Sequence, residues 1–433
     1  MYDSLISNIN IVLYILAWTV TIVLYHIKKK TIDAGSILLF TYLMYAITSL
    51  LLYNSPFYHF ARIRIFPFIY LFSILILVFW PILKYNDQKI DEIQKVPSIY
   101  ISIFSLIFII ASVVQLPTII SDFSTSISRL LNSSSGGLDL YNQAMAESRS
   151  IGDGKISNLA SIISNSFGNL GILLFFYYLT RKNRSKLILI GLFISSIMSI
   201  PINISLGQRG PILETLLSLI ITYFALRRFF QPKVKRILKI VGMSLLLASL
   251  VPVIALTISR FGNNTKGSMS SVYFYGGQQN LYFNNYGLDN GGIRYGDRTI
   301  PLFKRMLGFK NVPKNFMERR DKYPHLKMSD ENFYTFVGDF TLDFGPITAT
   351  FILLLFSLFV VIKTKIRDGI IRFHQLILLH FVMTVCMLGG LKLFPYSDVG
   401  GNLQLIVYFL AYMFFRLDYN IRFQRRSIEQ SVA

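Results

Sequence analysis

The 433-residue chain has little of what a soluble domain, a disulfide scaffold or a thiolate metal centre requires. It contains one cysteine, Cys386, which excludes an internal disulfide and a cysteine zinc site, so we expect a small core side chain there. Charged residues make up 15% of the sequence, against 53% hydrophobic residues. This balance is too apolar for an ordinary soluble domain of the same length.

Several catalytic and nucleotide-binding motifs are also absent. The sequence has no GxxxxGK[ST] phosphate loop, no dinucleotide fingerprint and no HExxH motif, which argues against a nucleotide-driven pump. The segments that we place outside the membrane lack Asp-x-Asp and lack His/Cys pairs at ligand spacing. We therefore expect no metal centre and no cofactor.

Long apolar stretches are the main feature that is present. About 20 apolar residues span the hydrocarbon core of a bilayer, and a helix satisfies its own backbone groups there. The sequence predicts an all-α integral membrane protein with about 11 transmembrane helices. The stretches cover residues 7–27, 34–53, 66–83, 98–116, 159–179, 187–206, 211–226, 237–258, 336–362, 373–391 and 403–419.

Acidic residues are scarce, with 22 Asp and Glu against 43 Lys and Arg and a net charge of +21. Basic residues cluster in every second loop, and these loops hold 24 of the 43. This positive-inside pattern indicates topology rather than a nucleic-acid partner. No basic residue precedes the first stretch and three lysines follow it at 28–30, so we predict a retained helix, with the N-terminus outside and the C-terminus cytoplasmic.

The predicted topology divides the chain into three parts. Residues 1–258 would form helices one to eight, with an outer loop at 117–155 whose Ser and Gly content predicts at most short helices. Residues 259–335 would form one large outer loop with short helices, one of them interfacial at 300–307. Residues 336–433 would form the last three helices and the cytoplasmic end. A long loop rich in aromatic residues is uncommon without a role, so we expect the function there.

Arg209 and Glu214 are candidates for substrate binding at the turn between the sixth and seventh stretches. Arg209 lies between two glycines, and its planar fork of donors suits phosphate oxygens. A snorkelling arginine in a tight turn is the alternative. Glu214 follows within the seventh stretch, where an acid needs a partner or a polar cavity. It would pair with Arg209 or lie shallow enough to reach water.

Asp343, Asp339 and His325 are candidates for catalysis. The two aspartates are four residues apart, which places both carboxylates on one helix face at the outer mouth of the ninth stretch. Neighbouring carboxylates in such a mouth can differ in pKa, which suits one of them to be a general base. Compensation of the helix dipole is the structural alternative. His325 precedes this helix and is either a base near neutral pH or an exposed loop residue.

Further cations of the large loop would hold an anionic substrate or lipid headgroups. Lys392 follows the tenth stretch and would join the same site. The loop arginines that we consider for binding are Arg260, Arg294, Arg298, Arg319 and Arg320.

The segments 207–210 (Gly-Gln-Arg-Gly) and 335–345, together with this topology, resemble the bacterial O-antigen and capsule repeat-unit polymerases of the Wzy type. The likeness in architecture covers the whole chain, whereas the sequence match covers only these two segments. The Arg-x10-Gly repeat described for some members is not found here. That departure leaves the assignment of particular loop arginines open.

The resemblance implies a metal-independent glycosyltransferase of the bacterial inner (plasma) membrane. A glycan would be moved from its undecaprenyl diphosphate onto a sugar hydroxyl of an incoming lipid-linked repeat. Arginines would stabilise charge on the leaving diphosphate, and a carboxylate or imidazole would take the acceptor proton. The expected partners are undecaprenyl-diphosphate-linked oligosaccharide and membrane lipid, with a chain-length regulator and a flippase as further ones.

Two other functions fit part of the pattern. A lipid-linked oligosaccharide flippase would need charged residues through a central cavity and short outer loops, whereas here Glu214 is the one acid well inside a stretch. An O-antigen ligase would share the topology and the donor but use a lipid A core acceptor.

Overall fold

The computed structural model describes residues 2–85, 87–133, 135–150, 159–261, 267–328, 332–366 and 369–432. Within them the chain is nearly all α-helical, apart from the two-residue strands β1 (Glu92–Ile93) and β2 (Ile370–Ile371), which pair in parallel. The longer helices and their connections have the following bounds. They are α1 (Tyr2–Lys29), α2 (Ala34–Tyr53), α3 (Ile65–Lys84), α4 (Ser98–Val113), α7 (Leu159–Thr180), α8 (Lys186–Ile197), α9 (Ser199–Ser205), α11 (Pro232–Phe261) and α18 (Asp398–Val432), with the 3-10 turns Asp87–Lys89 and Arg227–Phe229.

The structure confirms several helices that could cross a membrane, but it does not confirm the predicted number of eleven. Among the described residues, eight segments are long and apolar enough to cross a membrane. They are α1, α2, α3, α7, α8 with α9, α11, α16 and α18. Helices α4 and α5 are bent by 47° relative to each other and would make a ninth if they form one span.

Two of the predicted spans are short helices inside the bundle. Helices α10 (Gly210–Leu226) and α17 (Phe373–Gly389) have 17 residues each. Every residue of α17 is buried, and it packs on α2, α3, α7, α10 and α18. A helix covered on all sides by protein does not have to match the full thickness of the bilayer, which accounts for its length.

The predicted ninth span, 336–362, is wrong as a continuous helix. It is broken at Gly345, which has φ +79°, into α15 (Thr335–Phe344) and α16 (Pro346–Lys363). Glycine tolerates the left-handed backbone, and Pro346 suits the first turn of the next helix. The consequence is that α15 is not continuous with the apolar helix α16, and its aspartates can contact the 259–335 segment.

The two predicted outer segments contain longer helices than expected. The 117–155 segment holds α5 (Leu116–Asn132) and α6 (Gly136–Ser150), while residues 151–158 lie outside the described part. The 259–335 segment holds the 20-residue α12 (Gly267–Tyr286) besides the short α13 (Pro301–Met306) and α14 (Phe316–Lys322). Helix α12 packs along α2 so closely that a Cβ at Gly277 would lie 2.6 Å from the Thr48 carbonyl oxygen.

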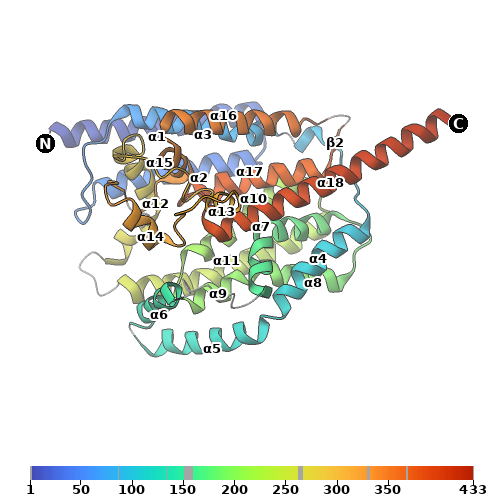
Figure 1. The fold of residues 1–433 in the computed structure, drawn as a ribbon, viewed down its shortest axis with the longest axis horizontal. Coiled ribbons are helices and arrows are strands. Elements are labelled where there is room, and N and C mark those ends of the chain that lie inside the picture. The colour runs from blue at the N-terminus through green and yellow to red at the C-terminus, as the bar shows by residue number, and fades with distance from the viewer. Residues whose placement is uncertain are drawn as a thin grey trace.

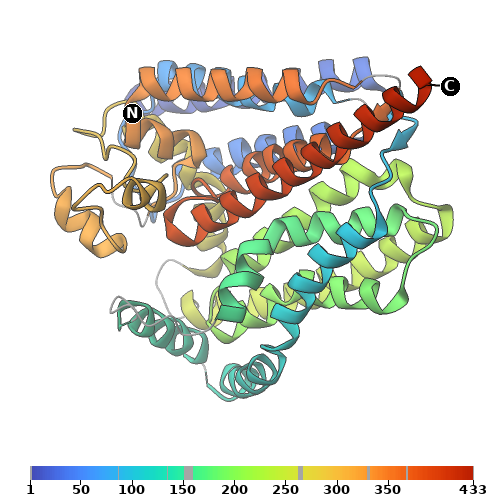
Figure 2. The ribbon, with the colours of Figure 1, turned by 45° about the vertical axis from the view of Figure 1, so that its right-hand side comes forward.

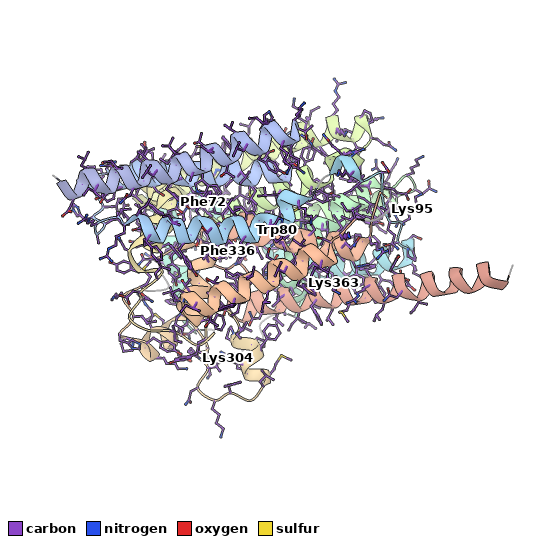
Figure 3. All side chains as sticks on the ribbon, turned by 90° about the horizontal axis from the view of Figure 1, so that it is seen from above. Phe72, Trp80, Lys95, Lys304, Phe336 and Lys363 are labelled. Carbon is purple, nitrogen blue, oxygen red and sulfur yellow. The ribbon has the colours of Figure 1, made fainter. Side chains whose placement is uncertain are left out.

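The arrangement places these segments at one end of the bundle. Helices α13, α14 and α15 lie near the N-terminus, while β2 and the end of α18 lie at the opposite end (Figure 1). Helices α5 and α6 project away from the layer of α1, α3 and α16 (Figure 2). Seen from above, Lys304 lies in a lobe that projects from one side of the bundle, and Lys95 lies toward the end to which α18 runs (Figure 3). The core between them is rich in aromatic rings, and Cys386 is buried there as predicted.

Candidate functional site

Two polar clusters lie at the end of the bundle that carries α13–α15, and the segment 390–398 between α17 and α18 joins them. The Lys392 carbonyl accepts a hydrogen bond from the Thr335 amide at 2.9 Å, and the Phe394 amide donates to Asp339 Oδ2 at 2.8 Å. The Tyr396 hydroxyl lies 2.7 Å from Thr384 Oγ1. Residues far apart in sequence are thereby held in one unit.

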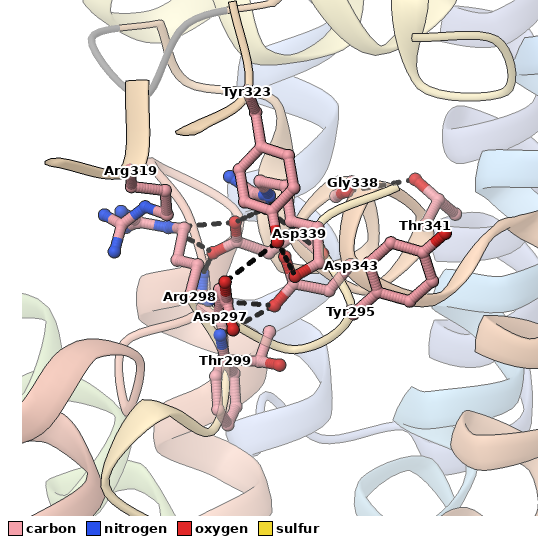
Figure 4. Close-up of polar contacts among 12 residues, drawn as sticks. Tyr295, Asp297, Arg298, Thr299, Arg319, Tyr323, Gly338, Asp339, Thr341 and Asp343 are labelled. Carbon is pink, nitrogen blue, oxygen red and sulfur yellow. Dashed lines mark hydrogen bonds and ion pairs between the residues drawn. The ribbon is translucent and has the colours of Figure 1, made fainter. Parts of the chain in front are cut away.

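The first cluster is an arginine–aspartate network (Figure 4). Its members are Arg294, Arg298, Arg319, Asp339, Asp343 and Asp398. Arg294 bridges the two aspartates of α15, with Nη2 at 3.0 Å from Asp339 Oδ1 and Nε at 2.7 Å from Asp343 Oδ1. Arg298 Nε lies 2.9 Å from Asp339 Oδ1, and its Nη1 lies 3.4 Å from Asp398 Oδ2.

The network follows from two four-residue spacings. Asp339 and Asp343 lie one turn apart on α15, as predicted, and Arg294 and Arg298 face them from the segment before α13. Backbone amides add to the pairing, because the Thr299 amide donates to Asp343 Oδ2 at 2.7 Å. With Arg319, which joins through Asp398, five of the predicted site residues are thus brought together.

Burial decides what these aspartates are suited for. The side chains of Asp339 and Asp343 are both 0% exposed. Burial raises the pKa of Asp343, with the charge of Arg294 acting in the opposite direction. A carboxylate enclosed by arginines and backbone amides cannot reach a substrate hydroxyl without rearrangement. The geometry suits Asp339 and Asp343 to positioning the arginines, and their catalytic role remains a prediction.

The rim of the network contains two acids that the sequence analysis did not single out. Asp398, with φ +58°, receives Arg319 Nη1 at 2.9 Å and is half exposed. Asp297 is buried beside Lys304, Lys322 and the Tyr323 hydroxyl, with the last two at 2.6 and 2.8 Å.

Burial alone would raise the pKa of Asp297, but the hydrogen bonds from its two lysines and Tyr323 outweigh it and lower the pKa. Nothing local in the sequence marks these two acids as distinct from solvated loop residues.

The second cluster is a polar cavity of about 250 Å³ enclosed by apolar helices. We call it the polar cavity and define it by its polar lining. These residues are Ser164, Asn165, Asn169, Ser195, Ser196, Ser199, Glu214, Thr215, Lys392 and Gln404. They come from α7, α8, α9, α10, α18 and the 390–398 segment. Glu214 and Lys392 are the charged groups among the described lining residues.

Glu214 forms its ion pair with Lys392 and not with Arg209, which precedes it at the start of the same helix. Glu214 Oε1 lies 2.6 Å from Lys392 Nζ, and both side chains keep partial exposure, 17% and 30%. The Arg209 guanidinium is buried, donates from Nη1 to Thr257 Oγ1 at 2.8 Å and lies over the Tyr275 ring at 4.2 Å. We predicted that Lys392 would join the loop arginines, whereas its ion pair is with Glu214 in the polar cavity.

The polar cavity also has hydroxyl groups that the protein does not satisfy. Ser195 and Ser196 are both buried, and their Oγ atoms have no hydrogen-bond partner. A buried polar group without a partner is costly, so such groups are expected to meet a ligand or water. The kink at Gly168, with φ +23°, lies beside Gln404 in the same wall. Single polar residues inside apolar stretches were the signal that the sequence analysis left unused.

The remaining candidates lie outside both clusters or outside the described side chains. His325 is exposed, with its ring 6.3 Å from that of Tyr323. Arg320 lines a small pocket with Arg294 and Arg319. The Arg260 side chain and residues 329–331 lie outside the described part of the chain. Within the described part of the chain, no three His, Cys, Asp or Glu side chains gather as metal ligands.

Comparisons of the chain with protein-family models, with curated proteins and with solved structures give no match, so the geometry above carries the functional argument.

Proposed function

We propose that this protein is a metal-independent glycosyltransferase that polymerises undecaprenyl-diphosphate-linked oligosaccharide repeat units at the outer face of a bacterial plasma membrane. The observation that carries the proposal is the polar cavity. Its lining combines amide and hydroxyl groups, which suit sugars, with one carboxylate and one ammonium group. Apolar side chains of the surrounding helices complete the lining. The two segments that resemble repeat-unit polymerases, 207–210 and 335–345, flank this cavity and the arginine–aspartate network.

In the proposed reaction, the acceptor hydroxyl oxygen attacks the anomeric carbon of the donor sugar. The bond from that carbon to the diphosphate oxygen breaks, and polyprenyl diphosphate leaves with the electron pair. The Glu214 carboxylate takes the acceptor proton, because it is the carboxylate among the described lining residues of the cavity. The ammonium group of Lys392, 2.6 Å from Glu214, compensates charge that develops on the leaving diphosphate.

In the proposed reaction, the arginine–aspartate network positions the segment that carries Lys392. Asp339 receives the Phe394 amide, two residues from Lys392, so the network fixes the segment that carries the ammonium group. Arg298 and Arg319 converge on the half-exposed Asp398 at the same end of the molecule. Approach of an anionic diphosphate to this rim would exchange Asp398 for phosphate oxygens, since arginine forks suit both.

The proposal includes an orientation, with the α13–α15 end outside and the C-terminus cytoplasmic. Cysteines at Leu307, which is 76% exposed, and at Gln231, also exposed, should react oppositely with an impermeant thiol reagent in a Cys386→Ala background. Gly277 is unsuitable for such a probe because a side chain there would meet Thr48. Labelling of Gln231→Cys from outside would overturn the orientation.

The function itself is tested by the glycans of a deletion strain and by the purified protein. Loss of polymer with a single repeat still attached to the final acceptor supports a polymerase. Complete loss of attached glycan points to a ligase or a flippase instead. Purified protein should lengthen lipid-linked repeats in detergent without added metal, and failure to do so with folded protein would overturn the proposal.

A further inference from the structure

A second large cavity lies at the opposite end of the bundle, away from both polar clusters. It has a volume of about 910 Å³ and is lined by the ends of α1, α3 and α16 and by residues 364–366 and 369. Lys363, labelled in Figure 3, directly precedes this segment at the end of α16. We call it the lysine cavity, after the five lysines in its lining. They are Lys28, Lys29, Lys84, Lys89 and Lys365.

Helix geometry accounts for only part of this convergence. Lys28 and Lys29 lie in the last turn of α1 and Lys84 in that of α3, where the helix dipole favours a cation. Lys89 is the last residue of the 3-10 turn Asp87–Lys89, and Lys365 follows the C-cap of α16, so these two lysines reach the cavity from two further segments. A general excess of lysine on one side of the membrane would not require that four separate segments contribute lysines to the lining of one cavity.

Among the described residues that line the lysine cavity there are five Lys and no Asp or Glu. Asp33 lies 3.7 Å from Lys29 Nζ, which also donates to the Tyr85 carbonyl at 2.6 Å, and the Asp91 side chain lies beside Gly369 at the rim. Ammonium groups gathered around one cavity repel one another, so an anionic group between them would lower the energy.

The rest of the lining indicates what kind of anion fits. Leu83, Val361, Ile362, Ile366 and Leu379 form apolar walls next to the ammonium groups. Ile362 is also strongly exposed on the outside of α16, where acyl chains of a bilayer would reach it. We propose that the lysine cavity binds the phosphate headgroup of an anionic phospholipid from the adjacent leaflet, with its acyl chains along α16.

The test measures lipid retention by the full-length protein in detergent, by native mass spectrometry with phosphatidylglycerol or phosphatidylcholine added. Wild type should retain phosphatidylglycerol in preference to phosphatidylcholine. The double variant Lys89→Gln/Lys365→Gln should lose this preference by about tenfold or more, because each lysine near a phosphate contributes on the order of 1 kcal/mol. The matched control is Lys182→Gln/Lys186→Gln, which removes the same charge from another loop predicted to face the same side.

Three outcomes would overturn the proposal. Equal loss in the control variant would mean that bulk surface charge holds the lipid. Equal retention of phosphatidylcholine would mean that the net negative charge of the headgroup is not recognised. Displacement of phosphatidylglycerol by millimolar glycerol phosphate or inorganic phosphate would mean that the cavity takes a soluble phosphate compound and not a lipid. Unchanged folding of both variants is checked by their thermal unfolding.

Discussion

The arginine–aspartate network and the polar cavity both contain ion pairs, yet they differ in what surrounds the charges. In the network, Asp339 and Asp343 are fully enclosed, and arginines and backbone amides contact their oxygens. In the cavity, Glu214 and Lys392 keep partial exposure beside open volume. A buried, fully paired group contributes to fixed geometry, whereas a partly exposed pair next to unsatisfied hydroxyls has room for a ligand.

This difference reverses the ranking that the sequence favoured. The i, i+4 aspartates were the more conspicuous pattern, and Glu214 was one acid within an apolar stretch. Catalysis requires an accessible group of suitable pKa, and the enclosed aspartates lack the access. Each prediction below uses a substitution in one region of the molecule, either a cluster or the Arg209 turn, that leaves the other regions intact.

The largest effect is expected for Glu214→Gln, which keeps the shape of the side chain but cannot accept a proton. The rate of polymer formation should fall by about 10²- to 10⁴-fold, as is usual for loss of a general base. The measurement is polymer formed from purified lipid-linked repeat per mole of folded protein. Asp289→Asn, at an exposed acid paired with Lys327, is the control and should keep its activity. A near-normal rate in Glu214→Gln would remove the cavity from the chemistry.

Asp343→Asn should act mainly on stability. Removing one of the two buried carboxylates that pair with Arg294 leaves it with Asp339 alone in this bridge and costs up to about 3–5 kcal/mol of unfolding free energy. The midpoint of thermal unfolding in detergent should fall clearly, and Asp398→Asn, at the half-exposed rim, should lower it much less. A stable Asp343→Asn protein that has lost turnover would instead make Asp343 the base, as the sequence suggested.

A smaller effect is expected at Arg209, where a planar fork stacks on an aromatic ring. Arg209→Lys keeps the charge but loses the stacked, oriented guanidinium over Tyr275 and its bond to Thr257. We expect polymer formation to fall about tenfold, corresponding to about 1–2 kcal/mol, and further in Arg209→Ala. Polymer of wild-type length and yield from the lysine variant would favour the snorkelling interpretation.

The smallest expected effect is a pH dependence at the rim of the network. The folded pKa of Asp297 is lowered, so its contribution to stability is complete above the ordinary pKa near 3.9 and is lost as pH falls below that value. The protection factors of the amides in 294–323, taken relative to intrinsic exchange at each pH, should therefore fall as the pH is lowered from about 4 to 3. Asp297→Asn should abolish this dependence. The raised pKa of Asp343 acts in the opposite direction, and the difference between wild type and Asp297→Asn isolates Asp297.

The sequence predicted what depends on local patterns. Apolar stretches predicted where helices lie, and the four-residue spacing predicted that Asp339 and Asp343 share a face. The break at Gly345 was missed although Gly-Pro was visible, because hydrophobicity continues across it. The length of α12 was missed because its Gly and Asn content is typical of loops, and its helix is supported by packing on α2.

The sites depend on contacts between distant segments, which one sequence does not reveal. Glu214 and Lys392 are 178 positions apart and still form one pair. Asn169 has partners in both α10 and the 390–398 segment, accepting from Ser218 Oγ at 2.7 Å and donating to the Tyr396 hydroxyl at 3.4 Å. Without coordinates, each of these residues is a single polar side chain in an apolar run, and many such side chains only bond their own helix.

The burial of α17 has a consequence for how the protein is made. This helix leaves the ribosome late, after α16, yet it packs on α2, α3, α7 and α10, all synthesised earlier. The helices made first must therefore keep an unfilled slot at the centre of the bundle until α17 arrives. A chain that stops before residue 373 would retain most of its membrane segments but lack the part that holds them together. Quality control that recognises exposed polar groups within the membrane would have its target in that intermediate, since Thr222 meets His380 only once α17 is in place.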